Sequence, residues 1–384
     1  MIPFNKPHMT GRELSHIAQA HFEGVLAGDG RFTKECQDDL QRRTGSRKVL
    51  LTHSCTAALE MAALLLDFKP GDEVIMPSYT FVSTANAFVL RGAVPVFVDI
   101  RADTLNMDER LIEDAITPRT KAIVPVHYAG VACEMDTINE VAAAHGLSVV
   151  EDAAQGVLSS YCGRPLGSLG QLGAFSFHET KNIISGEGGA LLINDPVLIS
   201  DAEVIWQKGT NRQQFHRGEV DKYTWQRPGS SFLPGEIVAA FLKAQLEEAE
   251  AITANRLAAW DRYHQRLQSL AREGLVGLPT IPGRCVHNAH MYYVILPEQV
   301  DRDRLLADLR RDGIHCLFHY VPLHSAPGGK VGRAHGSMTH TDSLSSRLIR
   351  LPLWWGISER EQDCVTDRLT HHLRAQLTCG AANA

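Results

Sequence analysis

The sequence contains no long hydrophobic run, since no segment approaches the roughly 18 consecutive apolar residues that a membrane-spanning helix needs. The first eight residues, Met1 to His8, also lack the charged-then-apolar layout of a signal peptide. We therefore expect no membrane association and a cytoplasmic location.

A surplus of positive charge is also missing. The formal net charge is -6, and lysine and arginine form no dense basic run. Proteins that bind nucleic acid usually carry a basic patch that neutralises phosphates. The charge balance thus argues against a nucleic-acid partner.

Cysteine pairs at metal or redox spacing are absent as well. The eight cysteines are scattered without a C-x-x-C pair, and a chain of 384 residues is long enough to fold without disulfides. His315 and His319 are close in sequence, but no cysteine or carboxylate accompanies them at ligand spacing. We expect reduced cysteines and no metal site.

Predicted strands and helices alternate through the first 150 residues. Short aliphatic runs predict strands at 48–52, 73–76, 94–98, 122–126 and 148–151, and amphipathic windows predict helices at 10–28, 32–43, 57–66, 80–90, 108–116 and 136–145. Alternation of this kind is typical of α/β folds, so we expect a mostly parallel sheet sandwiched by helices.

The pattern changes after residue 245. A helical stretch at 235–272 is followed by predicted strands at 291–296 and 315–320, predicted helices at 302–312 and 358–377, and a frayed tail at 378–384. We predict a large domain at 1–245 and a smaller C-terminal α+β domain at 246–384.

Lys181 lies in a polar turn between two apolar runs, 175–177 and 190–193, that both predict buried strands. An amine at the end of a sheet, where desolvation lowers its pKa, suits a lysine that forms a Schiff base. Taken alone, an ordinary solvated loop lysine is the better interpretation, because most lysines are exposed. Other residues must decide between the two.

Polar residues gather after the predicted strands, where parallel sheets bind ligands. Ser54–Thr56 begin a helix that could bind a phosphate, Tyr79 could stack on an aromatic ring, and Asp152, followed by Gln155, could hold a protonated ring nitrogen. Each residue also has a plain structural interpretation as a helix cap or core aromatic. Their shared placement with Lys181 favours a pyridine cofactor with a phosphate and an aldehyde.

Four segments strengthen this interpretation: Ser54–Leu59, Pro77–Val82, Glu151–Gln155 and Ser176–Lys181. They resemble the signatures of sugar-nucleotide aminotransferases of the DegT/DnrJ/EryC1/StrS family. Four others resemble the branch of that family that makes dTDP-4-amino-4,6-dideoxygalactose: Gly28–Gly30, His287–His290, His319–His324 and Arg350–Leu353.

The resemblance implies a fold-type-I, pyridoxal-phosphate-dependent homodimer with its active site at the subunit interface. Lys181 would be the Schiff-base lysine and proton carrier. The other cofactor-binding residues would be Asp152 at the pyridinium, Gln155 near the ring hydroxyl, Tyr79 stacked on the ring, and Cys55, Thr56 and Ser176 at the phosphate.

The resemblance also implies the substrates. L-Glutamate would supply the amine, and the 4-keto carbon of dTDP-4-keto-6-deoxy-D-glucose would receive it, in a pathway to polysaccharide antigens. Lys208 and Arg212 belong to a basic stretch, with Arg217, Lys222 and Arg227, that we expect to bind the nucleotide diphosphate, although a solvated loop is nearly as good an interpretation. His290 and Tyr320 line the sugar pocket or are buried core residues.

One position departs from the family pattern. Several relatives place an asparagine of the partner subunit against the phosphate, where this sequence has Leu233, which cannot donate that hydrogen bond. Ser230 or Ser231 could replace it, and Ser231 is our candidate.

Four other readings of the sequence compete with this one. Transfer to a different keto-sugar nucleotide fits the same motifs. Dehydratases of the superfamily carry histidine in place of Lys181, and an aminotransferase-like binding protein would need a DNA-binding domain that the 45 residues before the first strand do not suggest. The glycine-rich run 163–173 precedes a strand, whereas a dinucleotide-binding fingerprint follows one.

Overall fold

The computed structural model describes residues 1–381. Within them, eight strands form one large sheet in the order β1-β9-β8-β5-β4-β2-β3-β12. Their bounds are β1 Lys48–Thr52, β2 Glu73–Pro77, β3 Val94–Val98, β4 Thr120–Ile123, β5 Ser148–Asp152, β8 Leu172–Ser176, β9 Gly189–Ile193 and β12 Arg333–Ala334. The expectation of a mostly parallel sheet is confirmed, because β9 is the one strand of this sheet that runs in the opposite direction to the others.

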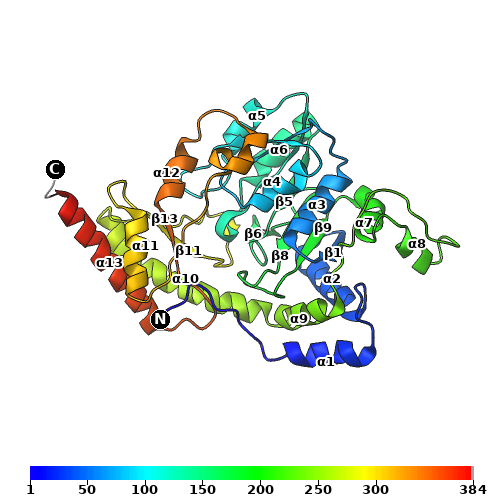
Figure 1. The fold of residues 1–384 in the computed structure, drawn as a ribbon, viewed down its shortest axis with the longest axis horizontal. Helices are drawn as coiled ribbons and strands as arrows, with labels where there is room; N and C mark the ends of the chain where they lie inside the picture. The colour runs from blue at the N-terminus through cyan, green and yellow to red at the C-terminus, as the bar shows by residue number, and fades with distance from the viewer. Residues whose placement is uncertain (382–384) are drawn as a thin grey trace.

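Helices cover both faces of this sheet (Figure 1). Their bounds are α1 Glu13–Glu23, α2 Arg31–Thr44, α3 Cys55–Leu65, α4 Val82–Val89, α5 Ile112–Ala115, α6 Met135–His145, α7 Ile199–Trp206, α8 Arg212–His216 and α9 Glu236–Glu247. Alternating strand residues point to opposite faces, so Val49 and Leu51 pack with α2 and α9, whereas Leu50 packs with α3 and α7. In residues 1–381, no helix combines the length and apolar character needed to cross a membrane.

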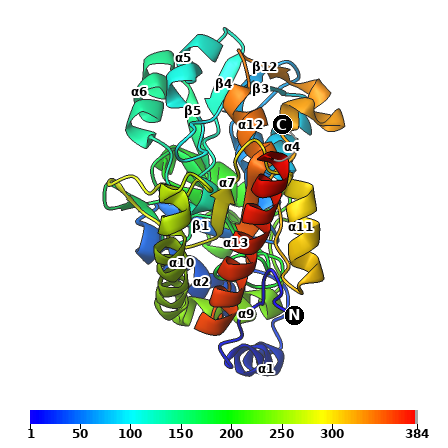
Figure 2. The same ribbon diagram turned by 90° about the vertical axis from the view of Figure 1, so that its left-hand side faces the viewer.

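The C-terminal elements build a third apolar core beside the large sheet. Helices α10 Ala249–Arg272, α11 Arg302–Arg311 and α13 Glu359–Ala381 pack around the antiparallel pair β11 Tyr292–Ile295 and β13 Leu348–Leu351 (Figure 2). The short helix α12 Thr339–Arg347 leads into β13. This arrangement fits the smaller α+β unit of the sequence analysis, and the division at residue 245 stays a prediction.

Two contacts tie the C-terminal elements to the large sheet. At the edge of the sheet, β12 pairs with β3, and Arg333 binds the buried carboxylate of Glu73 at 3.1 Å. Nearer the centre, the Asn288 side chain donates to the carbonyls of Gln155 and Val157, both at 2.8 Å. The second contact lies beside the strand ends where the site residues were expected.

The structure explains the glycine at the end of the Gly28–Gly30 motif by its close contact with Glu236, the first residue of α9. The Glu236 carboxylate accepts hydrogen bonds from the amides of Gly30, Phe32 and Thr33 and from the Thr33 hydroxyl, so it caps α2. A Cβ on Gly30 would come within 2.5 Å of the Glu236 side chain. Only glycine therefore fits against this buried carboxylate.

Several predicted elements need correction. The predicted strand at 315–320 is wrong: those residues form no named strand, and only Leu317 is bridged, to Arg350. The helix predicted at 108–116 is a 3-10 turn followed by α5, the helix predicted at 10–28 is limited to α1, and the stretch 235–272 is broken at Glu248 between α9 and α10.

The predicted tail also differs, because α13 continues through residue 381. Residues 382–384 of that predicted tail lie outside the described residues.

Candidate active site

The turn that carries Lys181 connects the ends of β8 and β9. The backbone N–H of Lys181 donates to the His178 carbonyl at 2.8 Å, and the Phe177 amide donates to Gly188 at 2.8 Å, which closes the turn at its base. The lysine therefore lies at the mouth of the sheet between two buried strands, as the sequence analysis expected.

The surroundings of Lys181 change its acidity. Burial lowers the pKa of the Lys181 amine from its usual value, the charges of Cys55 and Asp152 act in the opposite direction, and the Arg350 charge lowers it further. A lysine with a lowered pKa holds a larger neutral fraction near pH 7, and the neutral amine is the nucleophilic form. The amine is therefore suited to attack a carbonyl carbon.

Asp152 is the last residue of β5, and its carboxylate is held on both oxygens. The Thr84 hydroxyl donates to Oδ2 at 2.7 Å, and the Ala154 amide donates to Oδ1 at 3.2 Å. The residue is only 6% exposed. No lysine or arginine pairs with it among residues 1–381, so this buried carboxylate remains available to a cationic ligand group.

The neighbouring Glu151 faces the other side of β5 and anchors it. Its carboxylate accepts from the amides of Gly167, Leu169 and Gly170 at 2.6–2.8 Å and from His127 Nε2 at 2.9 Å. His127 Nδ1 accepts from an amide, so Nε2 carries the proton. The glycine-rich run 163–173 is a loop at residues 166–171, whereas Arg164–Pro165 form the short strand β7 and residues 172–173 begin β8. The loop amides satisfy a buried carboxylate behind Asp152.

The N-terminus of α3 opens toward the same strand ends. Ser54 caps the helix by accepting from the Ala57 amide at 3.1 Å, which leaves the amides of Cys55 and Thr56 without an acceptor in the described chain. Gly189 packs against this helix start, where a Cβ would lie 2.4 Å from the Cys55 nitrogen. Two free amides at a positive helix end form a binding site for a phosphate.

Helix α4 connects the phosphate end of the site to Asp152. The Thr56 hydroxyl donates to Ser83 Oγ at 2.8 Å, and the next residue, Thr84, donates to Asp152. Adjacent residues of α4 therefore hold both ends of the arrangement.

Four other predicted residues lie close to Lys181. Gln155, Ser176 and His290 line one small cavity together with Lys181, and Tyr320 accepts a hydrogen bond from Gln155 Nε2 at 3.1 Å. The Ser176 hydroxyl, at the end of β8, accepts only a long 3.4 Å bond from the His178 amide.

His290 is fixed in its neutral form. Asn182, which follows Lys181, donates through Nδ2 to the Asn288 carbonyl at 2.7 Å, so its Oδ1 accepts from His290 Nδ1 at 3.1 Å. Burial, together with the nearby Lys181 and Arg350 charges, lowers the pKa of His290 well below its usual value. The second ring nitrogen is then an acceptor beside the lysine.

Tyr79 belongs to a packed aromatic cluster. Its ring is 1% exposed, lies 5.1 Å from the Tyr128 ring and 5.5 Å from the Tyr320 ring, and its hydroxyl donates to the His319 carbonyl at 2.7 Å. Phe81, two residues later at the start of α4, is 58% exposed and lies 6.4 Å from Tyr320. The open aromatic face at the strand ends is therefore that of Phe81.

Three predicted residues lie apart from Lys181, on the segment 207–231, which we call the arm. Lys208, Arg212 and Ser231 are all exposed. The arm includes α8, is closed by bridges between Gln207 and Ser231 and between Thr210 and Trp225, and projects beyond α7 at the edge of the molecule (Figure 1).

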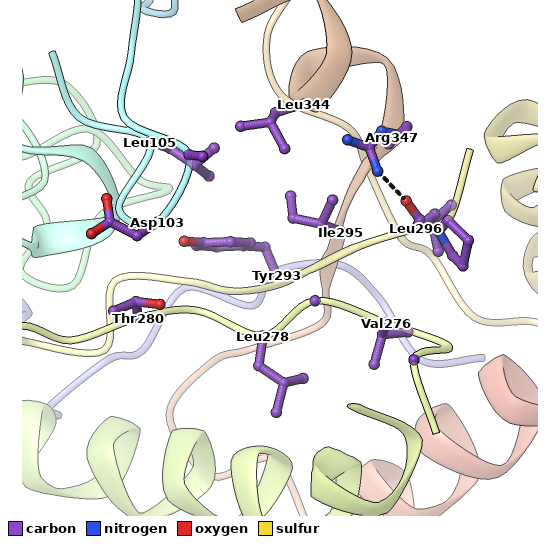
Figure 3. Close-up of a pocket in the computed structure, with 14 residues that line it drawn as sticks. Asp103, Leu105, Val276, Leu278, Thr280, Tyr293, Ile295, Leu296, Leu344 and Arg347 are labelled. Atoms are coloured by element: carbon purple, nitrogen blue, oxygen red, sulfur yellow. Dashed lines mark hydrogen bonds between the residues drawn. The ribbon is translucent and has the colours of Figure 1, made fainter. Parts of the chain in front are cut away.

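A separate pocket of about 340 Å³ lies between residues 102–105, residues 274–280 and β11 (Figure 3). Tyr293 and Arg347 line it, and Lys181 and Asp152 do not. The lysine, carboxylate and free amides are therefore not part of this pocket.

Sequence reasoning missed several residues of the site. Ser83 and Thr84 lie in the middle of a predicted helix, Asn182 is adjacent to Lys181, and Phe81 lies within a quoted motif. A polar pair in the first turn of the helix that follows a strand was a usable signal for Thr84, because the start of such a helix lies at the carboxyl edge of the sheet.

These donors fit pyridoxal phosphate. Amides and hydroxyls at α3 match its phosphate, the buried carboxylate of Asp152 matches a protonated ring nitrogen, and the amine of Lys181 matches its aldehyde. When bound there, this cofactor supplies an acceptor for the electrons released when an amino acid loses its α-proton.

Comparisons with known proteins agree with this fit. Residues 7–370 match the DegT/DnrJ/EryC1/StrS aminotransferase family. A member of that family from Brucella abortus is 30% identical, with 94% of this chain and 95% of that chain covered and a TM-score of 0.86.

Two further solved structures contain either pyridoxal phosphate or a ketimine intermediate. Spr1654 from Streptococcus pneumoniae, in its pyridoxal phosphate form, is 27% identical, with 98% and 99% of the two chains covered and a TM-score of 0.88. DesV from S. venezuelae, in complex with a ketimine intermediate, is 29% identical, with 97% and 98% covered and a TM-score of 0.86. The chain therefore belongs to the DegT/DnrJ/EryC1/StrS family and is a fold-type-I, pyridoxal-phosphate-dependent aminotransferase.

Proposed function

We propose that this enzyme transfers the amino group of L-glutamate to the 4-keto carbon of a nucleotide-linked 6-deoxyhexose. The substrate we favour is dTDP-4-keto-6-deoxy-D-glucose, and the product is dTDP-4-amino-4,6-dideoxy-D-galactose. The motifs at Gly28–Gly30, His287–His290, His319–His324 and Arg350–Leu353 support this choice of sugar.

The observation that carries the proposal is the placement of Lys181 and Asp152 at the ends of two paired strands: Asp152 is the last residue of β5, and Lys181 lies in the turn that follows its neighbour β8. The Asp152 side chain is buried and Lys181 is half-buried. The negative charge of Asp152 raises the pKa of the Lys181 amine, whereas burial lowers it. An amine and a carboxylate in this relationship can hold the aldehyde and the ring nitrogen of one pyridine cofactor. Retention of the lysine favours amine transfer over dehydration of the sugar.

Each residue of the site has a role in this proposal. Lys181 moves the proton at the carbon that loses or gains the amine. Cys55, Thr56 and Ser176 bind the phosphate, and Gln155 lies near the ring hydroxyl. The exposed ring of Phe81 is the better candidate for stacking on the cofactor, because Tyr79 is enclosed by Tyr128 and Tyr320.

The arm supplies charge for the nucleotide diphosphate. Arg217 is neutralised by Glu203 and Glu219, and Arg227 by Asp201. Lys208, Arg212 and Lys222 form no ion pair within residues 1–381, which makes them the available phosphate contacts.

The position of the arm favours a homodimer. The arm projects away from the large sheet and exposes Tyr223 and Trp225, the latter at 77% (Figure 1). Exposed aromatic rings beside lysine and arginine suit a contact with a second copy and with a nucleotide. We propose that the arm, including Ser231, reaches the active site of the partner subunit.

Product analysis tests the choice of substrate. The holoenzyme is incubated with dTDP-4-keto-6-deoxyglucose and L-glutamate, and NMR of the product should show an axial amine at C4 of a galacto-configured sugar. An equatorial amine, or turnover of only a different keto-sugar nucleotide, would overturn this assignment while leaving the aminotransferase activity intact.

Substitutions in the arm test its contact with the diphosphate. We expect Arg212→Ala and Lys222→Ala each to raise the Michaelis constant for the sugar nucleotide about 10-fold, as expected for one charge-assisted hydrogen bond. Arg217→Ala is the matched control, because its guanidinium is already paired with acids. Unchanged constants in both variants would rule out this role of the arm.

A further inference from the structure

Arg350 is a buried cation without an anionic partner. It is 8% exposed, lies on β13, and forms no ion pair with any aspartate or glutamate within residues 1–381. Its Nε has no hydrogen-bond acceptor. A buried charge is costly unless it is paired, so a buried guanidinium without a counter-charge points to an anionic ligand.

A second buried arginine shows the difference. Arg256 also lacks a carboxylate, but its Nε donates to the Ala289 carbonyl at 3.2 Å and its Nη2 to the His290 carbonyl at 2.8 Å. Arg256 therefore holds the chain that leads into β11. The Arg350 side chain, by contrast, makes one hydrogen bond within the described residues, from its Nη1 to His319 Nε2 at 2.5 Å.

The groups around Arg350 do not neutralise it. His319 accepts from the guanidinium, and burial and the Arg350 charge lower its pKa well below the usual value, so it stays neutral. Burial raises the pKa of Tyr320 to about 12 and that of Tyr128 well above its usual value. The Phe4 ring covers one face of the guanidinium at 4.5 Å. The guanidinium is thus oriented but keeps its full charge.

Arg350 also acts on the reacting end of the site. Its charge lowers the pKa of both Lys181 and His290. Contacts connect the guanidinium to the same place: Arg350 donates to His319, and the His319 ring stacks on Tyr320 at 3.9 Å. Tyr320 accepts from Gln155, which lines one cavity with Lys181, so an anion bound by Arg350 would lie near the carbon that exchanges the amine.

The chemistry of the two substrates identifies this anion. In an α-amino acid, the carbon that carries the transferred amine also carries a carboxylate. In a sugar nucleotide, the carbons next to C4 carry neutral groups, and the diphosphate is attached at C1 on the far side of the ring. We propose that Arg350 binds the α-carboxylate of the amino-acid donor, with His319 as the residue that positions the guanidinium.

This role separates the two half-reactions. In the first, Arg350 forms a charge-assisted and potentially bidentate pair with the donor carboxylate. In the second, the same guanidinium faces uncharged sugar groups and contributes little binding. The inference rests on the proposed use of an amino-acid donor, but not on the identity of the sugar.

The test uses Arg350→Met in the holoenzyme and measures each half-reaction by single-turnover absorbance. We expect the apparent dissociation constant for L-glutamate to rise about 100-fold or more, because one partner of a buried pair is removed. The constant for the keto-sugar nucleotide should change less than about 3-fold. A rise for the sugar nucleotide without one for glutamate would overturn the proposal.

Binding without turnover supplies a second measurement. 2-Methylglutamate and 2-methylalanine both carry an α-carboxylate but have no α-proton to lose. Arg350→Met should weaken both to the same extent, as measured by the absorbance change of the holoenzyme. Weakening of 2-methylglutamate alone would assign Arg350 to the side-chain carboxylate and contradict the proposal.

Two further variants control for misfolding. Arg350→Lys keeps the charge and should lose less affinity for glutamate than Arg350→Met. Arg347→Met is the matched control on the same segment, because Arg347 donates to the Leu296 and Ser343 carbonyls at the pocket of Figure 3 and should leave both constants unchanged. If the wild-type enzyme does not react with L-glutamate, the proposed amino donor is wrong. If Arg350→Met binds L-glutamate as tightly as the wild-type enzyme does, the proposed role of Arg350 is wrong.

Discussion

The Thr84 hydroxyl donates a hydrogen bond to Oδ2 of Asp152 over 2.7 Å, and both side chains are buried. Thr84 in turn is held by the Thr80 hydroxyl at 2.7 Å. The Asp152 carboxylate is therefore oriented by a neutral donor on α4, which leaves its negative charge unpaired within the described residues and, in the proposed site, available to the ring nitrogen of the cofactor.

Loss of this hydroxyl should weaken cofactor binding. Thr84→Val keeps the shape of the side chain but leaves Oδ2 without its donor, and a hydrogen bond to a charged group contributes about 1.5–3 kcal/mol. We expect the dissociation constant of pyridoxal phosphate, measured by fluorescence titration of the apoenzyme, to rise about 10- to 100-fold. Thr84→Ser retains the donor and should remain near wild type; equal values for both variants would contradict this role of Thr84.

Replacement of Lys181 should abolish useful turnover. Lys181→Ala removes the group that moves the proton, which typically contributes a factor on the order of 10² to 10⁴ in rate, together with the covalent anchor. Lys181→Arg should fail as well, because arginine stays protonated. Steady-state amine transfer measures both variants, and substantial activity in either would exclude Lys181 as the catalytic lysine.

Stability should depend on the capping carboxylate of Glu236. Glu236→Gln replaces an acceptor of several amide and hydroxyl hydrogens with a group that has a donor of its own, so we expect a loss of about 2–4 kcal/mol in the free energy of unfolding. Denaturant unfolding measures it. Glu247→Gln, at the end of the same helix and paired with Arg12 and His16 near the surface, should cost less than about 1 kcal/mol.

Glu73 should make stability depend on acidic pH. Burial alone would raise the pKa of its carboxyl, but hydrogen bonds from Arg333, Arg119 and Thr117 outweigh burial and lower the pKa from 4.5 to about 2. A folded-state pKa below the unfolded value stabilises the fold above pH 4.5, and this contribution is lost as the pH falls toward 2.

The variant Glu73→Gln isolates this effect. The difference in melting temperature between wild type and Glu73→Gln should be constant near neutral pH and should shrink as the pH falls from about 4.5 to about 2. A difference that stays constant through this range would show that the carboxylate does not stabilise the fold by its charge.

The sheet was predictable from the sequence because its strands are buried on both faces. Runs such as Val94–Val98 and Ala190–Ile193 are continuously apolar, and polar residues mark their ends. The reversed direction of β9 was not predictable, because a buried strand has the same composition in either direction. The pairing of β12 with β3 connects residues more than 200 positions apart and leaves no local signal.

The predicted strand at 315–320 failed for a related reason. The apolar run within His315–Tyr320 favours a strand, but Leu317 and Phe318 are nearly half exposed. The segment is held by contacts to distant residues: Leu317 is bridged to Arg350, and the His315 amide donates to the Ile2 carbonyl at 3.0 Å. Long-range contacts of this kind override a local sequence pattern. The bridge between Leu317 and Arg350 also places Arg350 beside this segment.

The orientation of side chains within motifs was also beyond the sequence. Tyr79 and Phe81 stand two residues apart in one motif, and only the packing of Tyr79 against Tyr128 and Tyr320 distinguishes the enclosed ring from the open one. The common location of Lys181, Asp152, Gln155 and Ser176 was predictable, because the ends of neighbouring strands meet at one edge of the sheet. Their roles stay predictions.

The most direct measurement is to identify the lysine that holds the cofactor. The purified holoenzyme is reduced with borohydride, digested, and mapped by mass spectrometry, while the loss of its absorbance band near the visible range is followed. A pyridoxyl group on Lys181 is the predicted result. A pyridoxyl group on any other lysine, or no modified lysine in a protein saturated with pyridoxal phosphate, would contradict the assignment of this site.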